Sequence, residues 1–162
     1  PGDNDPLDVC EIGLRQIKTG VIRPVKVLGI LAMIDDDETD WKVVVIDAQD
    51  RWAPELNDID DIERLLPGTL DLIREWFRTF KIPDGKPPNK FAFDEKFLPA
   101  SFALKIIHET HEEWKHLVGT QDEEQTKIGL HLPSKDKVKC STVERDTKII
   151  RNLSETNLSA LA

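Results

Sequence analysis

Two runs of apolar, β-branched residues dominate the first third of the chain. The first extends from Val21 to Ile34 and stops at an acidic stretch, and the second extends from Trp41 to Asp47. Runs of this length and composition are typical of buried strands. We therefore predict a hairpin whose turn is the acidic stretch, with Asp35 and Asp40 at the two ends of the loop.

Apolar residues recur at helical spacing after the second predicted strand. A short helix is expected to begin at Asn57 and to end at Pro67 and Gly68, because asparagine caps helices while proline and glycine terminate them. Two longer amphipathic helices are expected over residues 69–81 and 101–118, where apolar side chains return every three or four positions. Together these elements predict an α+β fold in which amphipathic helices flank a sheet.

The end of the chain differs in character from what precedes it. Beyond Gly119 the sequence is polar and lacks a repeating apolar pattern. Such a segment cannot bury enough apolar surface to offset the entropy lost on ordering. We therefore expect one folded domain over residues 1–119 and a loosely ordered tail over residues 120–162.

The composition narrows the class of protein. The 162 residues are 39% hydrophobic and 33% charged, as in a water-soluble globular domain. No apolar run approaches the roughly 18 to 20 residues of a membrane span, so no membrane partner is expected. The net charge of −9 argues against nucleic acid, which binds basic surfaces. Only two cysteines, Cys10 and Cys140, are present, which favours a reducing compartment; we expect the cytoplasm, with the mitochondrion as the alternative.

Three carboxylates lie close together at the start of the chain. The sequence GDNDPLDV predicts a tight turn, fixed by Gly2 and Pro6, that brings Asp3, Asp5 and Asp8 together. Two such charges about 4 Å apart repel by about 4 kcal/mol at an effective dielectric near 20, a cost that a bound cation offsets. Carboxylate ligands suit magnesium, manganese or calcium. A solvated acidic turn that binds no metal is the alternative interpretation.

A second polar group lies at the predicted hairpin. Asp40 and Lys42 are two residues apart, so their side chains share one face of a strand. A carboxylate for a metal ion and an ammonium for phosphate would then point into one cleft, the pairing used in magnesium-assisted phosphoryl chemistry. Lys81 ends a predicted helix, where the helix carbonyls alone already favour a cation. An exposed charged turn and a structural lysine are the alternatives.

Several longer motifs resemble one enzyme family. The segments GDNDPLDV, VKVLGILAMIDDDETDWKV, EWFRTFKIPDGKPPNKFAF and EEWKHLVG resemble eukaryotic family I soluble inorganic pyrophosphatases. The resemblance extends from Gly2 to about Gly119, and GDNDPLDV is highly specific when ETDWK and KIPDGKP follow it. It implies an inorganic diphosphatase, which hydrolyses diphosphate to two phosphates with magnesium, or with manganese as a substitute.

The resemblance also implies a role for each candidate residue. Metal ions would be held by four aspartates: Asp3, Asp8, Asp40 and, for an ion that arrives with diphosphate, Asp35. Asp5 would be the general base that takes a proton from the attacking water. Lys42 and Lys81 would bind phosphate oxygens and offset charge on the leaving group.

The fold implied by the resemblance is a five-stranded OB-like β-barrel flanked by helices, of which this chain carries a part. Family members have a long segment before GDNDPLDV that supplies several strands and further glutamate, lysine, arginine and tyrosine site residues. This sequence does not contain that segment, so it represents about half an enzyme. Phe80 stands where eukaryotic members usually have a tyrosine that donates a hydrogen bond to phosphate, so we expect conserved packing and weaker phosphate binding.

Three functional hypotheses follow from these observations. The first is a hydrolase whose partner is diphosphate, with a homodimer as a further expectation. The second is a non-catalytic truncated isoform or interaction protein that retains the metal-binding turns without a closed barrel. A calcium-buffering acidic module ranks last, because an EF-hand loop that opens at Asp3 would need glycine and glutamate where Asp8 and Leu14 stand.

Overall fold

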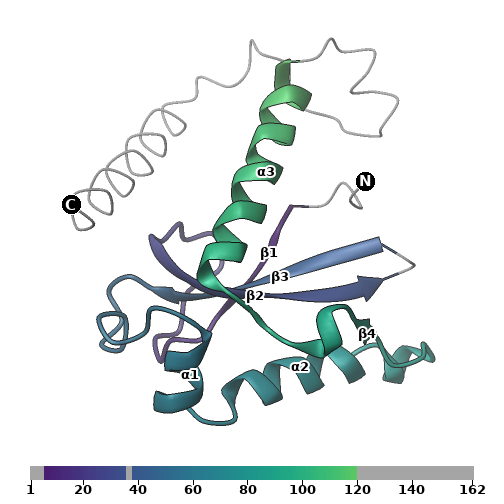
Figure 1. Ribbon diagram of the computed structural model, residues 1–162, viewed down its shortest axis with the longest axis horizontal. Coiled ribbons are helices and arrows are strands. Elements are labelled where there is room, and N and C mark those ends of the chain that lie inside the picture. Colours follow the sequence, from purple (N-terminus) through teal and green to yellow (C-terminus); the bar gives the residue numbers. More distant parts are fainter. Residues whose placement is uncertain (1–5, 36–37, 120–162) are drawn as a thin grey trace. The chain divides into compact units, whose positions relative to one another are not determined.

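The computed structural model describes residues 6–35 and 38–119, which form a sheet with helices on both of its faces (Figure 1). Asp3 and Asp5 of the predicted acidic turn, and the predicted tail over residues 120–162, lie outside the described residues. No helix within the described residues is both long enough and apolar enough to cross a membrane.

Within the described residues, five strands form one mixed sheet. They are β1 (Asp8–Glu11), β2 (Val25–Asp35), β3 (Glu38–Asp47), β4 (Lys90–Phe91) and β5 (Leu98–Pro99). The order is β1-β3-β2-β4, and β5 pairs with a different stretch of β2. β1 runs parallel to β3, whereas the other pairings are antiparallel. Within residues 6–35 and 38–119 no pairing joins β1 to β4 or β5, so the sheet is open, in agreement with the predicted partial barrel.

The predicted hairpin is confirmed as β2 and β3, but its first strand begins later than expected. β2 starts at Val25 and not at Val21. Pro24 explains the difference, because proline has no backbone N–H to donate to a neighbouring strand. Val21 and Ile22 are accordingly exposed.

The two strands of this hairpin also extend further along the chain than the sequence suggested. Asp35 is paired with Glu38, so residues 36–37 alone connect the two strands. Asp40 lies within β3, opposite Met33 of β2, and not at the end of a loop as predicted. Asp35 and Asp40 therefore belong to the strands themselves, where the alternation of side chains fixes their direction.

Three helices confirm the helical part of the prediction: α1 (Ile59–Leu65), α2 (Thr69–Thr79) and α3 (Ala100–Gly119). Asp58, and not Asn57, caps α1, since its carboxylate accepts a hydrogen bond from the backbone N–H of Ile59 at 2.7 Å. Gly68 precedes α2 with a φ of 83°, a conformation that favours glycine. α1 and α2 cover one face of the sheet and α3 covers the other (Figure 1).

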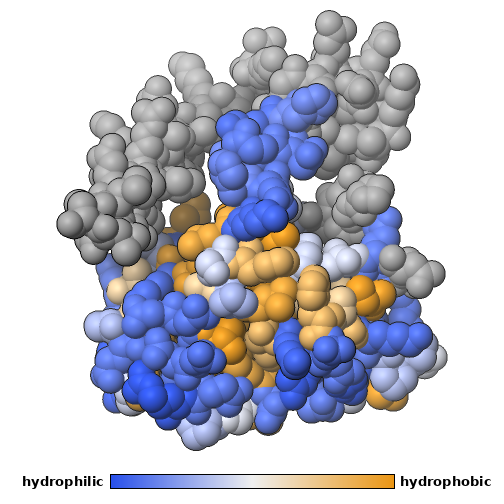
Figure 2. Space-filling model, in the orientation of Figure 1, coloured by the Kyte–Doolittle hydropathy of each residue, from blue (hydrophilic) through white to orange (hydrophobic). Residues whose placement is uncertain are grey.

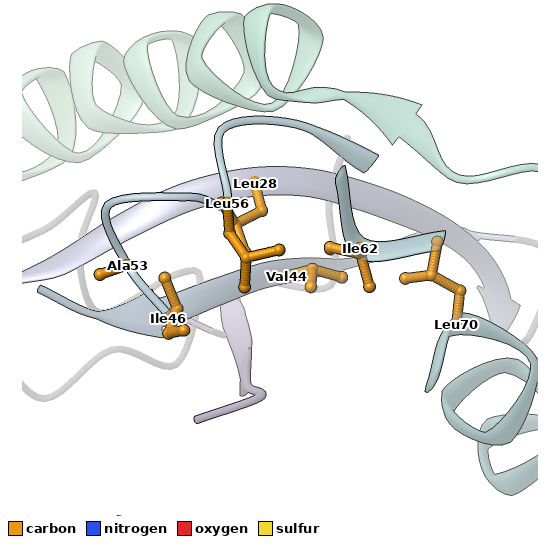
Figure 3. Close-up of a cluster of buried hydrophobic side chains, with 7 residues drawn as sticks. All are labelled: Leu28, Val44, Ile46, Ala53, Leu56, Ile62 and Leu70. Carbon is orange, nitrogen blue, oxygen red and sulfur yellow. The ribbon is translucent and has the colours of Figure 1, made fainter. Parts of the chain in front are cut away.

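Burial of both faces explains why the apolar runs in the sequence are almost unbroken. Along β3, Val44 and Ile46 pack toward α1 and α2, while Val43 and Val45 pack toward α3. Figure 3 shows the first of these two clusters, which α1, α2 and the loop before them complete: Leu28, Val44, Ile46, Ala53, Leu56, Ile62 and Leu70. The hydrophobic core therefore holds α2 against the sheet, and α2 carries residues of the candidate site described below.

Leu56→Ala should destabilise the chain by about 2 to 5 kcal/mol, because Leu56 is 0% exposed and its truncation leaves a cavity in this cluster. The matched control is Leu72→Ala, which removes the same atoms from a side chain that is 74% exposed and should change stability by less than about 0.5 kcal/mol. Urea unfolding followed by circular dichroism measures both. Equal losses in the two variants would contradict the packing described here.

Candidate active site

The candidate site lies on the face of the sheet that α2 covers, at the end where β2 and β3 meet their turn. Asp40 and Lys42 stand two residues apart in β3, and the Nζ atom of Lys42 lies 2.5 Å from Oδ2 of Asp40. This contact confirms the prediction that the two side chains share one face. It also shows that the ammonium group is bonded to the carboxylate and does not merely lie beside it.

Asp8 reaches the same lysine from a different strand. β1 places Asp8 directly opposite Lys42, and Nζ of Lys42 donates to Oδ2 of Asp8 at 2.5 Å. The predicted tight turn therefore does not extend to Asp8, which is instead the first residue of β1. Parallel pairing between segments 34 residues apart brings the two carboxylates to one ammonium group.

Asp35 and Lys81 form a second pair of the same kind. Asp35 is the last residue of β2, and Lys81 follows the residue that ends α2. Their side chains meet with Nζ of Lys81 2.5 Å from Oδ2 of Asp35. The structure thus brings together the five predicted site residues that it describes: Asp8, Asp35, Asp40, Lys42 and Lys81. It arranges them as two lysine–aspartate groups.

Burial and hydrogen bonding set the charge states of these groups. Lys42 is only 3% exposed, and burial would lower the pKa of its ammonium, but the hydrogen bonds that it donates to Asp40 and Asp8 outweigh that effect and raise the pKa. The hydrogen bond from Lys81 lowers the pKa of the Asp35 carboxyl. Lys42 is therefore cationic and Asp35 anionic at neutral pH. The site presents charged groups of both signs to any ligand.

Aromatic rings at the C-terminal end of α2, one within the helix and one on the residue that caps it, lie close to the two lysines. Nζ of Lys42 is 5.3 Å from the centre of the Phe77 ring, and Nζ of Lys81 is 5.5 Å from the centre of the Phe80 ring. At these distances the negative face of a ring attracts an ammonium group. Trp76 stacks on Phe80 with ring centres 4.9 Å apart and meets Phe77 edge to face. The three rings form a single platform on α2.

Sequence reasoning missed two members of this arrangement. Phe77 belongs by its spacing to the apolar stripe of the helix predicted over residues 69–81, and its contact with Lys42, 35 residues away in the sequence, has no local signal. Asn89 is buried, donates from Nδ2 to the backbone oxygen of Phe77 at 2.8 Å and contacts the sulfur of Met33. It fixes the end of α2 against β2. Nothing in its loop sequence pointed to that role.

An apolar hollow of about 280 Å³ opens beside this platform, lined by Cys10, Leu72, Ile73, Trp76 and Phe77. Burial raises the pKa of the Cys10 thiol to about 11, so the group is protonated at neutral pH and is a poor nucleophile. Figure 2 shows a broad apolar area in the middle of the face that it presents. Leu72 and Trp76 of the hollow are exposed, so the part of the chain that the structure describes leaves apolar surface uncovered close to the charged site.

The donor atoms of the site fit a hard divalent cation. Asp8 and Asp40 each direct one carboxylate oxygen at a single cationic atom, and carboxylate oxygens are the ligands that magnesium and manganese prefer. Among residues 6–35 and 38–119 there is no group of three or more histidine, cysteine, aspartate or glutamate side chains with metal-binding geometry. The described residues therefore do not form a metal-binding cluster by themselves.

Comparison with known proteins points to one family. The family model described as inorganic pyrophosphatase matches residues 1–115. The inorganic pyrophosphatase of Eremothecium gossypii is 52% identical over 129 residues, which cover 80% of this chain and 45% of the relative. The human inorganic pyrophosphatase is 56% identical over 117 residues, covering 72% and 40%. This chain thus spans about half the length of the curated relatives that it matches.

Solved structures give the same result. The inorganic pyrophosphatase of Schistosoma japonicum is 54% identical with a TM-score of 0.71, and the match covers 72% of this chain and 41% of that one. An N-terminal domain truncated form of the vacuolar soluble pyrophosphatase of Trypanosoma cruzi, in complex with PPi, is 50% identical with a TM-score of 0.72, covering 74% and 45%. The open sheet and its helices are therefore part of a fold found in these enzymes.

Proposed function

We propose that this chain, which belongs to the inorganic pyrophosphatase family, carries the metal-binding and phosphate-binding part of an enzyme that hydrolyses diphosphate to two phosphates. The observation that carries the proposal is the convergence of Asp8, Asp40 and Lys42 on one face of the sheet. Carboxylates for a cation and an ammonium for an anion are the groups needed to bind a metal–diphosphate complex. The match of residues 1–115 to the family model and the 56% identity to the human relative support the proposal that these groups bind metal and diphosphate.

The metal is proposed to be magnesium, with manganese as a substitute. Asp8 and Asp40 would hold it together with Asp3, and Asp35 would hold a further ion that arrives with the substrate. The support is chemical, since each of these ligands offers hard carboxylate oxygens. Asp8 and Asp40 already share one cationic group, the ammonium of Lys42. When bound, the metal would screen the negative charge of diphosphate and lower the pKa of the attacking water.

The protein groups would divide the remaining work. Asp5 would accept a proton from the attacking water. The water oxygen would form a bond to one phosphorus while the bond between that phosphorus and the bridging oxygen breaks. Lys42 and Lys81 would donate hydrogen bonds to phosphate oxygens and offset the charge that develops on the leaving phosphate. Phe80 would pack beneath Lys81 without supplying a hydroxyl group of its own.

The wider setting of the site is also part of the proposal. The five strands would belong to an OB-like barrel, which the further strands of full-length family members would close. The site would then lie at the mouth of the barrel. We propose diphosphate as the ligand, a homodimer as the assembly and the cytoplasm as the location, with the mitochondrion as the alternative. Gel filtration with light scattering tests the homodimer directly.

Magnesium should raise the thermal unfolding midpoint of residues 1–162, because a ligand that binds only the native state adds RT ln(1 + [L]/Kd) to its stability. At a hundredfold excess over Kd the gain is about 2.7 kcal/mol. Thermal melts with and without magnesium chloride measure it. The double variant Asp3→Asn/Asp8→Asn should lose the shift, whereas Asp94→Asn, which alters an exposed aspartate, should keep it. An unchanged wild-type midpoint would refute the metal site.

A further inference from the structure

The two lysine–aspartate groups of the site share one construction. Lys42 donates to Asp8 and Asp40 and lies over the ring of Phe77. Lys81 donates to Asp35 and lies over the ring of Phe80. In each group a lysine ammonium is bonded to carboxylate oxygens and also lies over an aromatic ring at the C-terminal end of α2. The carboxylates involved are those proposed above to bind metal.

The ammonium of Lys42 has little freedom in this position. An ammonium group has three N–H donors and no acceptor. Two of the donors of Lys42 are used by Asp8 and Asp40, the Phe77 ring lies on a further side, and the residue is only 3% exposed. Water can therefore reach the group only to a small extent. The lysine acts as the counter-ion of both carboxylates.

A divalent ion and this ammonium cannot occupy the fork between Asp8 and Asp40 together. Both would use the same Oδ2 atoms, which now lie 2.5 Å from the lysine nitrogen. The repulsion between a double and a single positive charge is twice that between two single charges at the same separation, and burial strengthens it. An ion that binds the Oδ2 atoms of these aspartates must therefore displace the ammonium group.

We infer that Lys42 and Lys81 are internal counter-ions that hold the place of the divalent ions, and that each ammonium leaves its aspartates when an ion binds. The inference rests on the proposed function, because it takes these aspartates to be metal ligands. A displaced ammonium needs a new anionic partner, and a phosphate oxygen supplies one. The lysines thereby couple the two ligands, so that phosphate strengthens metal binding and, by reciprocity, metal strengthens phosphate binding.

The test compares magnesium affinities in the absence of any added anion. Lys42→Met and Lys81→Met keep an apolar side chain and remove the competing charge, and isothermal titration of residues 1–162 with magnesium chloride measures the affinity. Each variant should bind magnesium about tenfold more tightly than wild type, since displacement of a charge-assisted hydrogen bond is no longer required. The matched control is Lys96→Met, a lysine that is mostly exposed and 3.9 Å from Asp94, which should change the affinity by no more than about twofold.

Inorganic phosphate provides the second arm of the test. It should tighten magnesium binding by the wild type and by Lys96→Met, and should do so less for Lys42→Met, which has no ammonium to transfer. Circular dichroism shows whether each variant is folded. If Lys42→Met is not, then Lys81→Met decides the outcome, because Lys81 is on the rim of the site and is less buried.

The outcomes separate this inference from the proposed function. Unchanged or weaker magnesium binding by the folded lysine variants, with measurable binding by the wild type, overturns the inference and leaves the metal site in place. No magnesium binding by the wild type or by any variant overturns the metal site, and the inference with it. Tighter binding by the two site variants, with Lys96→Met unchanged, supports both.

Discussion

Asp5→Asn should lower the turnover of diphosphate by about 10² to 10⁴-fold, the usual contribution of a general base, while magnesium affinity changes far less. The comparison requires a protein that joins this chain to the amino-terminal segment of the human relative. Asp5 is three residues before Asp8 in the sequence, and the family resemblance gives it the role of the base. Asparagine keeps the shape of the side chain and cannot accept the proton of water at neutral pH.

Phosphate release under saturating magnesium diphosphate measures turnover, and isothermal titration measures magnesium affinity in the same preparation. Asp94→Asn makes the same chemical change at an exposed position away from the lysine–aspartate groups and should leave both quantities near their wild-type values. Parallel losses of turnover and of magnesium affinity in Asp5→Asn would identify Asp5 as a metal ligand and not as the base.

The elements of the fold that follow from local sequence were predictable. The β-branched runs gave the hairpin of β2 and β3, and helical spacing of apolar residues gave α2 and α3. The shared face of Asp40 and Lys42 followed from the period of a strand and is confirmed by their contact. In each of these cases the information lies within a few consecutive residues.

Features that depend on distant contacts were not predictable in the same way. The four residues of β1 carry little strand signal, and they form a strand because they pair in parallel with β3, more than 30 residues away. This pairing, and no property of the local sequence, places Asp8 opposite Lys42. The late start of β2 is different, because Pro24 is visible in the sequence and its missing N–H could have been used to end the strand there.

The candidate site shows the same division between local and distant information. Its charged residues are visible in the sequence, but no local pattern indicates that each lysine bonds to an aspartate. The rings beneath the lysines were treated as parts of an apolar stripe, and only the position of Phe77 relative to β3 reveals its contact with Lys42. The roles of Asp3 and Asp5 stay predictions, since both lie outside the described residues.

Residues 1–162 on their own should hydrolyse magnesium diphosphate at a rate at least 10² to 10³-fold below that of the joined protein. Each electrostatic donor that is lost costs about that factor, and the resemblance implies a further lysine and arginine in the segment that this sequence does not contain. Within the described residues, Lys42 and Lys81 are the cations bonded to the site aspartates, so they alone would offset the charge of the substrate there.

The open sheet should add to this loss by promoting self-association. β1 pairs on one side only among the described residues, and the hollow beside it exposes Leu72 and Trp76 to solvent. Unpaired strand edges and uncovered apolar surface favour contacts between copies of a chain. Light scattering should therefore detect larger species as the concentration of residues 1–162 rises, and Leu72→Lys should reduce them without affecting the buried core.

Complementation distinguishes a missing segment from an intrinsically defective site. Phosphate release is measured for residues 1–162 alone, for the chain mixed with the amino-terminal segment of the human relative, and for the joined protein. If the described site is sound, activity should return on mixing, because the added strands cover the open edge and supply the missing cations. The same mixture made with Lys42→Met should stay inactive, while the mixture made with Lys96→Met should recover. Rapid hydrolysis by residues 1–162 alone would contradict the prediction, and would mean that two lysines and an open sheet are sufficient for the chemistry.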